Sequence, residues 1–116
     1  MISGYSQCSF RDLKVSQSKT GAVVHGKYPE WVVVITNTCS TCSQSNVFLN
    51  CFQFHSAEPV DPSLLKPENP SLLRGSQIGF CLLNNGLPIF KNSVKFKYAW
   101  NNTFPLHPIS SYVSCN

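Results

Sequence analysis

Charged side chains are scarce in this chain of 116 residues, and acidic side chains are the scarcest. Nine residues are Lys or Arg and only five are Asp or Glu, which gives a net charge of +4 at pH 7. Disordered tail proteins depend on abundant charge, so the composition excludes that class. The lysines are also too few, and too seldom interleaved with exposed aromatic residues, to indicate a nucleic-acid-binding surface.

Long apolar runs are missing as well. No stretch approaches the roughly 20 apolar residues of a membrane-spanning helix, so we expect no membrane insertion. The first seven residues, MISGYSQ, lack the apolar h-region of a signal peptide. We therefore expect residues 1–7 to form a flexible N-terminal segment without a visible signal peptide, and residues 8–116 to form one cysteine-rich domain.

Catalytic motifs are the third absence. The three histidines, His25, His55 and His107, are scattered, and no G-x-S-x-G nucleophile motif occurs. The five carboxylates show no pairing pattern along the sequence. Triad members can meet in space without being sequence neighbours, yet scattered histidines are usually solvated or structural. We predict a protein that is not an enzyme and that needs no cofactor.

Cysteine, in contrast, is plentiful. The six cysteines are Cys8, Cys39, Cys42, Cys51, Cys81 and Cys115. An even number in so short a chain predicts a disulfide framework and therefore an oxidising, secretory compartment. The sequence leaves the connectivity open. A pair between Cys8 and Cys115 is expected only if the first and last strands are neighbours.

A zinc site is the alternative use of these cysteines. Cys39 and Cys42 form a C-x2-C pair, and Cys51 with His55 forms a C-x3-H pair, so the four residues offer a tetrahedral Cys3His ligand set. Zinc would leave the other three cysteines without partners. The apolar segment that contains Cys51 also predicts a strand rather than a ligand loop. We favour disulfides.

Alternating and β-branched patterns predict strands along most of the chain. The β-branched run Trp31–Ile35 predicts a central strand buried on both sides, and Asn84-Asn85-Gly86 predicts a tight turn. The predicted strands are residues 13–17, 23–24, 31–35, 47–52, 78–83, 94–98 and 112–115. About seven to eight short strands with turns between them predict an all-β fold, an antiparallel β-sandwich stapled by disulfides.

Proline marks the one long segment without a strand pattern. Between Glu58 and Pro70 the chain has prolines at positions 59, 62, 67 and 70. Proline lacks the amide donor that a central strand needs, and it disfavours helix. We predict a long ordered loop.

Two groups of side chains are candidates for binding. Lys91, Lys95 and Lys97 are predicted along one exposed strand edge, where lysines discourage edge-to-edge pairing or attract an acidic partner. Trp100, at the end of the same strand, is the best candidate for an exposed aromatic contact, and core packing is an equally good interpretation of it.

A sequon agrees with a secretory compartment. Asn101-Asn102-Thr103 matches N-x-[ST], which makes Asn101 a candidate glycosylation site. Such triplets also arise by chance.

The order of these motifs resembles the plant Tapetum Determinant family. The resemblance runs from Cys8 to Cys115 and keeps all six cysteines in order. The segments that carry it are Leu13–Gln17, Trp31–Cys39, Val47–Cys51, Phe54–Ser56, Val60–Pro62, Cys81–Pro88, Phe96–Ala99, Asn102–Pro105 and Tyr112–Cys115.

The resemblance implies a small, secreted, cysteine-rich protein of the plant apoplast. Founding members of the family act as ligands of leucine-rich-repeat receptor kinases that set anther cell fate, so the implied partner is the ectodomain of such a receptor and the implied role is developmental signalling. The proline segment and the basic strand are the expected contacts.

A weaker likeness, to the β-sandwich carbohydrate-binding module of some plant cellulases, implies an alternative function. It rests on the patterns V-x-Q, G-x-x-x-x-W-x-V-x-I-x-N and F-x-Y. This chain would then be a non-catalytic, cell-wall-associated module that holds a glycan with Trp100.

Overall fold

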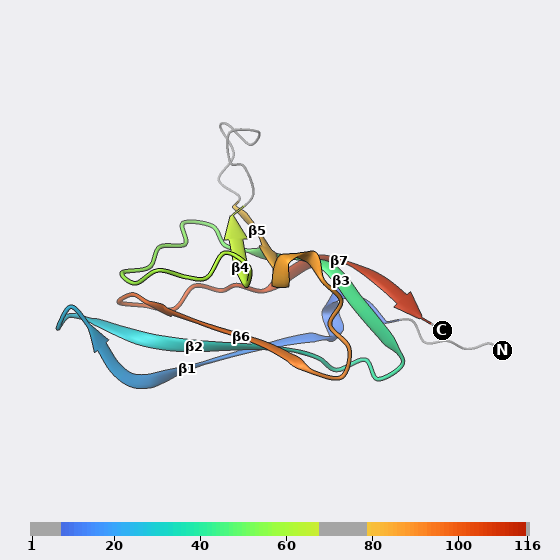
Figure 1. Cartoon of the computed structure of the whole chain (residues 1–116), viewed down its shortest axis with the longest axis horizontal. Helices are drawn as coiled ribbons and strands as arrows, with labels where there is room; N and C mark the ends of the chain where they lie inside the picture. Colours follow the sequence, from blue (N-terminus) through green and yellow to red (C-terminus); the bar gives the residue numbers. More distant parts are fainter. Residues whose placement is uncertain (1–7, 68–78, 116) are drawn as a thin grey trace.

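Two antiparallel sheets pack face to face in the computed structural model, which describes residues 8–67 and 79–115 (Figure 1). The three-stranded sheet has the order β1 (Leu13–Val24), β2 (Tyr28–Asn37), β6 (Ser93–Ala99), and the four-stranded sheet has the order β4 (Leu65–Pro67), β5 (Phe80–Leu83), β3 (Cys42–Asn50), β7 (Pro108–Cys115). Two short 3-10 helices, η1 (Phe10–Asp12) and η3 (Asn84–Gly86), precede β1 and follow β5. The all-β sandwich prediction is confirmed. The predicted flexible segment, residues 1–7, lies outside the described residues.

The hydrophobic core lies between the sheets, where the alternating patterns place it. The side chains with no exposed surface come from both sheets and from the loop before β7, and they include Val33, Ile35, Val47, Leu49, Cys81, Leu83, Tyr98 and Leu106. β2 is the central strand of its sheet, as its β-branched run predicts. The prediction that it is buried on both sides is wrong, because Val32 and Val34 lie on the outer side of the sheet and are only half-buried. No helix in the described part of the chain is long and apolar enough to cross a membrane.

Tight turns fix the strand register. The β1–β2 hairpin closes with the Lys27 amide donating to the Val24 carbonyl at 3.1 Å. His25 and Gly26, the two central residues of this turn, have φ values of 55° and 65°. Positive φ at both central positions gives the turn a twist that matches the flanking strands. The predicted turn at Asn84-Asn85-Gly86 is likewise observed, with positive φ at all three residues.

Several strand boundaries differ from the sequence prediction. β3 begins at Cys42 and β7 at Pro108, both upstream of the predicted starts, because serines and a buried glutamine hide the apolar alternation. The predicted proline loop ran from residue 58 to residue 70, of which 68–70 lie outside the described residues. The prediction that it is unbroken is wrong at Leu65–Pro67, which forms β4. β4 is a short edge strand, and an edge strand tolerates a proline at its end.

All six cysteines form disulfides, which confirms the predicted framework. The pairs are Cys8–Cys39, Cys42–Cys115 and Cys51–Cys81. The suggested pair of Cys8 with Cys115 is wrong, because β1 and β7 lie in different sheets and Cys115 stands opposite Cys42 in the β3–β7 register. Two of the three disulfides therefore lie within the four-stranded sheet or at the ends of its strands.

A buried polar cluster joins the two sheets near these disulfides. Asn37, the last residue of β2, donates its side-chain amide to the carbonyls of Cys42 and Ile89 at 3.0 and 2.9 Å. Gln44 on β3 is fully buried, and its Oε1 accepts a hydrogen bond of 2.6 Å from the Ser111 hydroxyl on β7. Because buried polar groups are costly unless they are paired, this cluster fixes how the ends of β2, β3 and β7 meet.

Candidate functional site

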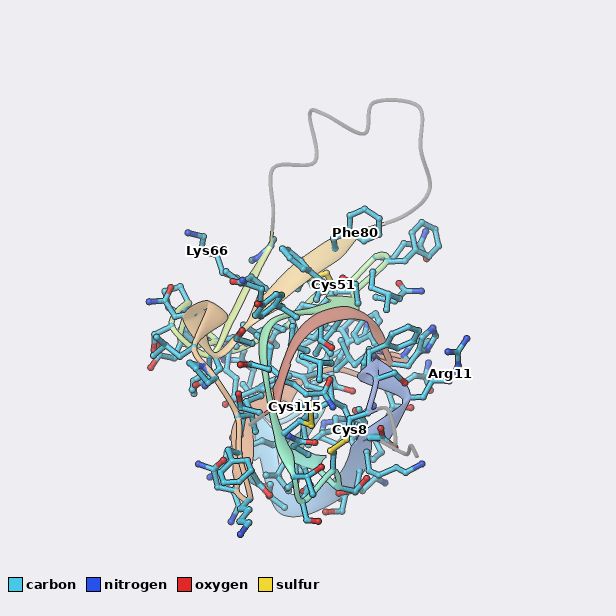
Figure 2. The ribbon with its side chains drawn as sticks, turned by 90° about the vertical axis from the view of Figure 1, so that its right-hand side faces the viewer. Cys8, Arg11, Cys51, Lys66, Phe80 and Cys115 are labelled. Atoms are coloured by element: carbon cyan, nitrogen blue, oxygen red, sulfur yellow. A yellow bond between two sulfur atoms is a disulfide. The ribbon has the colours of Figure 1, made fainter. Side chains whose placement is uncertain are left out.

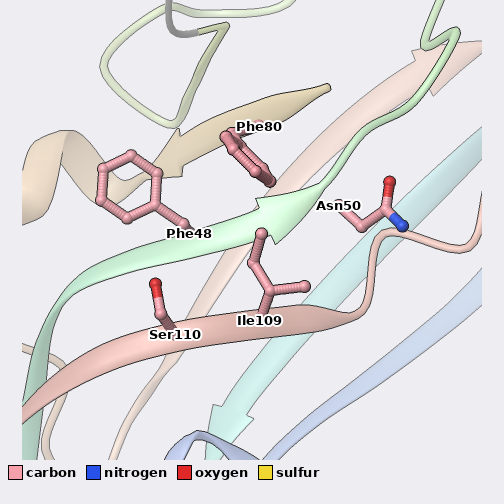
Figure 3. Close-up of a pocket in the computed structure, with 5 residues that line it drawn as sticks. All are labelled: Phe48, Asn50, Phe80, Ile109 and Ser110. Atoms are coloured by element: carbon pink, nitrogen blue, oxygen red, sulfur yellow. The ribbon is translucent and has the colours of Figure 1, made fainter. Parts of the chain in front are cut away.

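The outer side of the four-stranded sheet carries a shallow apolar hollow (Figure 3). Val47 and Leu49 of β3 point into the core, so Phe48 and Asn50 point outward. The hollow has a volume of about 530 Å³ and is lined by Phe48, Asn50, Phe80, Ile109 and Ser110. Phe80 projects from the outside of this sheet (Figure 2).

The hollow belongs to a larger surface without charge, because β3, β5 and β7 contain no Asp, Glu, Lys or Arg. A second hollow of about 250 Å³, between Thr41, Ser43, Phe90 and Ser114, continues it along β3 and β7. Tyr112, between the two hollows, is 63% exposed. We call this surface the uncharged face. It consists of Ser43, Ser45, Phe48 and Asn50 of β3, Phe80 and Leu82 of β5, and Ser110, Tyr112 and Ser114 of β7.

The outer side of the three-stranded sheet has the opposite character. Lys95 and Lys97 are exposed on β6, opposite Val34 and Val32 of β2, and Lys14 is exposed on β1. We call these five residues the basic face. The sequence predicts exposed lysines on the strand that corresponds to β6, and Lys95 and Lys97 are both exposed there.

Lys91 does not share that face. β6 begins at Ser93, so Lys91 lies in the preceding turn with a φ of 57°. Its ammonium group stands 5.2 Å from the centre of the Phe90 ring. The prediction that it lines up with the other two lysines on one strand edge is therefore wrong. The spacing of Lys91, Lys95 and Lys97 would place all three on one face only if the strand began at or before Lys91, and β6 begins at Ser93.

Trp100 is half-buried at the end of the sandwich. Its ring stacks on Tyr28 with centroids 5.0 Å apart and an interplanar angle of 1°, and the His55 ring meets it edge-on at 4.5 Å. Its backbone carbonyl accepts a hydrogen bond from the Trp31 indole at 3.1 Å. The structure thus shows Trp100 packed between β2 and the loop that contains His55. A glycan contact at Trp100 stays a prediction, and Tyr28 already covers one face of the ring.

Two carboxylates that are distant in sequence come together. Burial raises the pKa of Glu58, and the neighbouring Glu30 carboxylate on β2 raises it further. A hydrogen bond of 2.7 Å from the Thr20 hydroxyl, followed by the interaction with Glu58, lowers the pKa of Glu30. Sequence spacing gave no sign of this pair, because the two residues lie on different elements. Lys97 is close enough to favour the charged form of both.

The zinc ligand set proposed from sequence does not assemble. Cys51 is bonded to Cys81, while Cys39 and Cys42 are bonded to Cys8 and Cys115. The sulfurs of Cys8, Cys39 and Cys42 do lie within 4.8 Å of one another, but each is held in a disulfide.

The candidate glycosylation residue, Asn101, is exposed in a bend directly after β6. The loop that follows is fixed at Phe104, whose amide donates to the Tyr98 hydroxyl at 3.1 Å and whose carbonyl accepts from the Gln17 side chain at 2.6 Å. The sequon is therefore accessible on an ordered part of the chain. Its modification stays a prediction.

Comparison with known proteins identifies the family. The family model described as Tapetum determinant 1, C-terminal, matches residues 9–116. This chain belongs to the Tapetum determinant 1 family. Among curated proteins, the TPD1 protein homolog 1B of Oryza sativa subsp. japonica is 31% identical over 102 residues, which cover 85% of this chain and 54% of that protein. The chain thus spans about half the length of this relative. No solved structure matches it.

The family match covers five of the six cysteines and says little about surfaces. The matched region contains Cys39, Cys42, Cys51, Cys81 and Cys115, and Cys8 stands directly before it.

The uncharged face is not among the surfaces predicted from the sequence, although the sequence carries a signal for it. Strand segments 42–50, 80–83 and 108–115 lack charge altogether, and an outward-facing phenylalanine in such a segment indicates a contact surface.

Proposed function

We propose that this Tapetum determinant family member is a secreted ligand, without enzymatic activity, for the ectodomain of a plant leucine-rich-repeat receptor kinase. The observation that carries the proposal is the family match over residues 9–116. The role follows from the family resemblance in the sequence, which implies developmental signalling in the apoplast. Three disulfides in a small chain support an oxidising, extracellular location.

A disulfide-stapled sandwich suits the proposed role. A rigid ligand loses little conformational freedom on binding, so more of its contact energy appears as affinity. Leucine-rich-repeat proteins offer an extended concave surface that fits a whole side of a small domain. The elongated three-stranded sheet, with strands of up to 12 residues, presents such a side.

The basic face supplies the charge for this contact. Lys14, Lys95 and Lys97 stand around two valines, with Glu30 at the far end of the sheet. Opposite charge on a partner would speed association and orient the complex. We therefore propose an acidic receptor surface as the counterpart of the basic face.

Capture of a receptor tests the proposal. The oxidised protein, immobilised away from the basic face, is incubated with plant membrane extract, and leucine-rich-repeat ectodomains are identified among the retained proteins. The expected result is one receptor class whose binding saturates at or below micromolar ligand. Absence of any saturable receptor would sink the proposal. Reduced and alkylated protein is the control, and it should capture none.

Glycan affinity provides the counter-test. Because Tyr28 covers one face of the Trp100 ring, we expect no retardation of this protein in gels that contain cellulose, xylan or callose. Retardation that disappears in Trp100→Ala would instead support the carbohydrate-binding alternative. A Phe104→Leu variant, altered in the same loop and away from the Tyr28 stack, controls for disturbance of the loop.

A further inference from the structure

The sandwich has four edge strands, and three of them are protected against pairing with other chains. β1 carries Lys14 and Lys19 and has an irregular register before Val23. β6 carries Lys95 and Lys97. β4 is only three residues long and ends in a proline. Lysine, bulges, proline and short length are the devices by which proteins prevent edge-to-edge association.

The fourth edge, β7, carries no lysine and is longer than β4, although its register with β3 shifts on both sides of Phe48 and is regular only over Tyr112–Cys115. It runs for eight residues, Pro108–Cys115, with no charged side chain, and its single proline stands at the first position. The Cys42–Cys115 disulfide ties its end to β3, so the strand is held extended. Tyr112, near its middle, is an exposed large hydrophobic side chain.

The outer backbone edge of β7 is free within the described part of the chain. Its ladder partner is β3, and residues 108–115 make no backbone hydrogen bond to a described residue outside that strand. η1 packs beside β7 without bonding to its backbone. The cluster around Ser111 and Gln44 lies on the inner side of the strand. A row of unpaired amides and carbonyls is therefore presented next to the uncharged face.

The absence of charge on β7 favours a second copy of this chain as the partner, because the matching uncharged edge is then β7 of that copy. The net charge of +4 opposes self-association in general, but the lysines of the basic face lie on the other sheet. Joining two copies at β7 keeps both basic faces away from the contact and brings no charged strand residue together. It also makes the uncharged faces of the two copies one continuous surface, because β7 belongs to each of them.

We propose that two copies of this protein pair antiparallel through β7 to form a twofold-symmetric dimer with one continuous eight-stranded sheet. Outward side chains must stand opposite outward side chains in such a pair. In a register centred on the strand, Tyr112 then faces Tyr112 or Ser110 of the second copy. Aromatic and cross-strand pairs of this kind stabilise antiparallel sheets. The dimer would present two basic faces, one from each copy.

Sedimentation equilibrium of the oxidised full chain tests the pairing. We expect a monomer–dimer equilibrium between micromolar and hundreds of micromolar protein. Hydrogen exchange of the amides on the outer edge of β7 should slow as concentration rises. A chain that stays monomeric throughout this range overturns the proposal, as does a dimer whose β7 amides exchange at the monomer rate.

Charge substitution at Tyr112 tests the symmetry. Tyr112→Lys and Tyr112→Glu each place like charges across the twofold axis and should weaken dimerisation by about tenfold or more. An equimolar mixture of the two variants should restore it, because opposite charges then meet. Tyr112 is mostly exposed, so both variants should fold. Thermal unfolding and intact disulfides confirm this before association is measured.

Ser45→Lys is the matched control. Ser45 stands opposite Tyr112 on β3, on the same face but one strand away from the edge. Edge pairing predicts that Ser45→Lys dimerises nearly as the wild type does. Equal loss of dimer in both lysine variants would indicate face-to-face stacking and would overturn pairing through β7. If the mixture of Tyr112→Lys and Tyr112→Glu fails to associate, the symmetric register is overturned.

Discussion

The outer side of the three-stranded sheet carries lysines on β1 and β6, whereas β3, β5 and β7 of the four-stranded sheet contain no charged residue. One core lies between the two sheets, so the difference does not arise from burial. Outer faces of sandwiches are usually polar. Phe48 and Phe80 on an uncharged outer face therefore indicate contact with another molecule, while the lysines mark a solvated side suited to an acidic partner.

The sheets also differ in how they are held together. The three-stranded sheet has long strands of 12, 10 and 7 residues. The four-stranded sheet has strands of 3, 4, 9 and 8 residues, and two disulfides cross-link β3 with β7 and the end of β3 with β5. The Cys51–Cys81 disulfide reinforces β5, a short strand with few ladder hydrogen bonds, whereas the Cys42–Cys115 disulfide closes the end of the longer β3–β7 ladder.

Among the substitutions that test how the two sheets are held together, removal of the Cys42–Cys115 disulfide should have the largest effect. The bond closes a loop of sequence separation 73, and the chain-entropy estimate for such a loop is about 4 kcal/mol. The Cys42→Ala/Cys115→Ala double variant should lose about that much free energy of unfolding in guanidinium titrations. Its β7 amides should exchange faster, while those of β2 should change little.

The Cys8→Ala/Cys39→Ala variant is the control, because this disulfide has a separation of 31 and lies outside the strands. By the same chain-entropy estimate it should cost about 0.7 kcal/mol less, and it should leave β7 protected. Equal deprotection of β2 and β7 in the first variant would show that the four-stranded sheet does not depend on its own disulfides.

Asn37→Ala should have the next largest effect, since Asn37 joins the two sheets. The substitution leaves two buried carbonyls, those of Cys42 and Ile89, without this donor. It also removes the acceptor of the Cys39 amide. Loss of a buried polar network of this kind costs about 2–4 kcal/mol of unfolding free energy. Chemical denaturation measures it.

Thr36→Ala is the control for Asn37. Thr36 is the preceding residue, and its hydroxyl bonds to Ser93 on the outer side of the sheet. A surface hydrogen bond of this kind is worth about 0.5–1 kcal/mol. Similar losses of unfolding free energy in both variants would show that the buried cluster stabilises the contact between the sheets no more than a surface hydrogen bond does.

The sequence predicted the fold best where side-chain alternation is regular. Phe96 and Tyr98 on β6 are buried as expected, because apolar residues alternate with lysines on that strand, and Val33 and Ile35 are the buried positions of the continuous apolar run on β2. β3 was placed too late. Its first inward position after Cys42 is Gln44, a polar residue whose burial depends on partners that spacing cannot reveal, namely Ser111 in β7 and Ser9 before η1.

The candidate surfaces were predicted less completely, for a related reason. Lys95 and Lys97 were found because exposed positions on one strand are encoded locally. The Glu30–Glu58 pair and the disulfide partners are set by topology, since they join segments that meet only after both sheets have formed. The uncharged face was encoded as an absence of charge spread over three strands, which a search for motifs does not register.

Lysine substitution should sharpen the contrast between the two faces at the level of binding. If the proposed receptor contacts the basic face, Lys95→Ser/Lys97→Ser should weaken binding by about fivefold to tenfold, mostly through slower association, and should flatten its salt dependence. Surface-based kinetics with the captured receptor at low and high salt measure both quantities.

Lys66→Ser removes a lysine from the four-stranded sheet, at β4, and is the control for that experiment. It should leave association and its salt dependence nearly unchanged. A loss in Lys66→Ser as large as in the double variant would show that net charge, rather than the basic face, drives the encounter with the receptor.

The smallest effect is expected at the carboxyl pair on the rim of the three-stranded sheet. Burial raises the pKa of Glu58, so the folded protein holds this proton more tightly than the unfolded chain does, and stability falls as pH rises from the ordinary value of 4.5 through the raised pKa. Glu30 has the opposite sign, because its lowered pKa adds stability that is lost as pH falls below its ordinary value. Stability from the pair is therefore greatest between the two shifted values, where one proton is shared.

Glu58→Gln keeps the neutral form of Glu58 at every pH, so it should raise the melting temperature at pH 7 by about 1–2 °C and have no effect near pH 4. Glu30→Gln removes the charged acceptor of the Thr20 hydroxyl and should lower the melting temperature at pH 7. Scanning calorimetry of both variants across this pH range separates the two signs. Parallel curves for Glu58→Gln and the wild type would mean that Glu58 is as free to ionise in the folded protein as in the unfolded chain. The rim of the basic face would then carry one more fixed negative charge beside Lys97, and less of its positive field would remain for a partner.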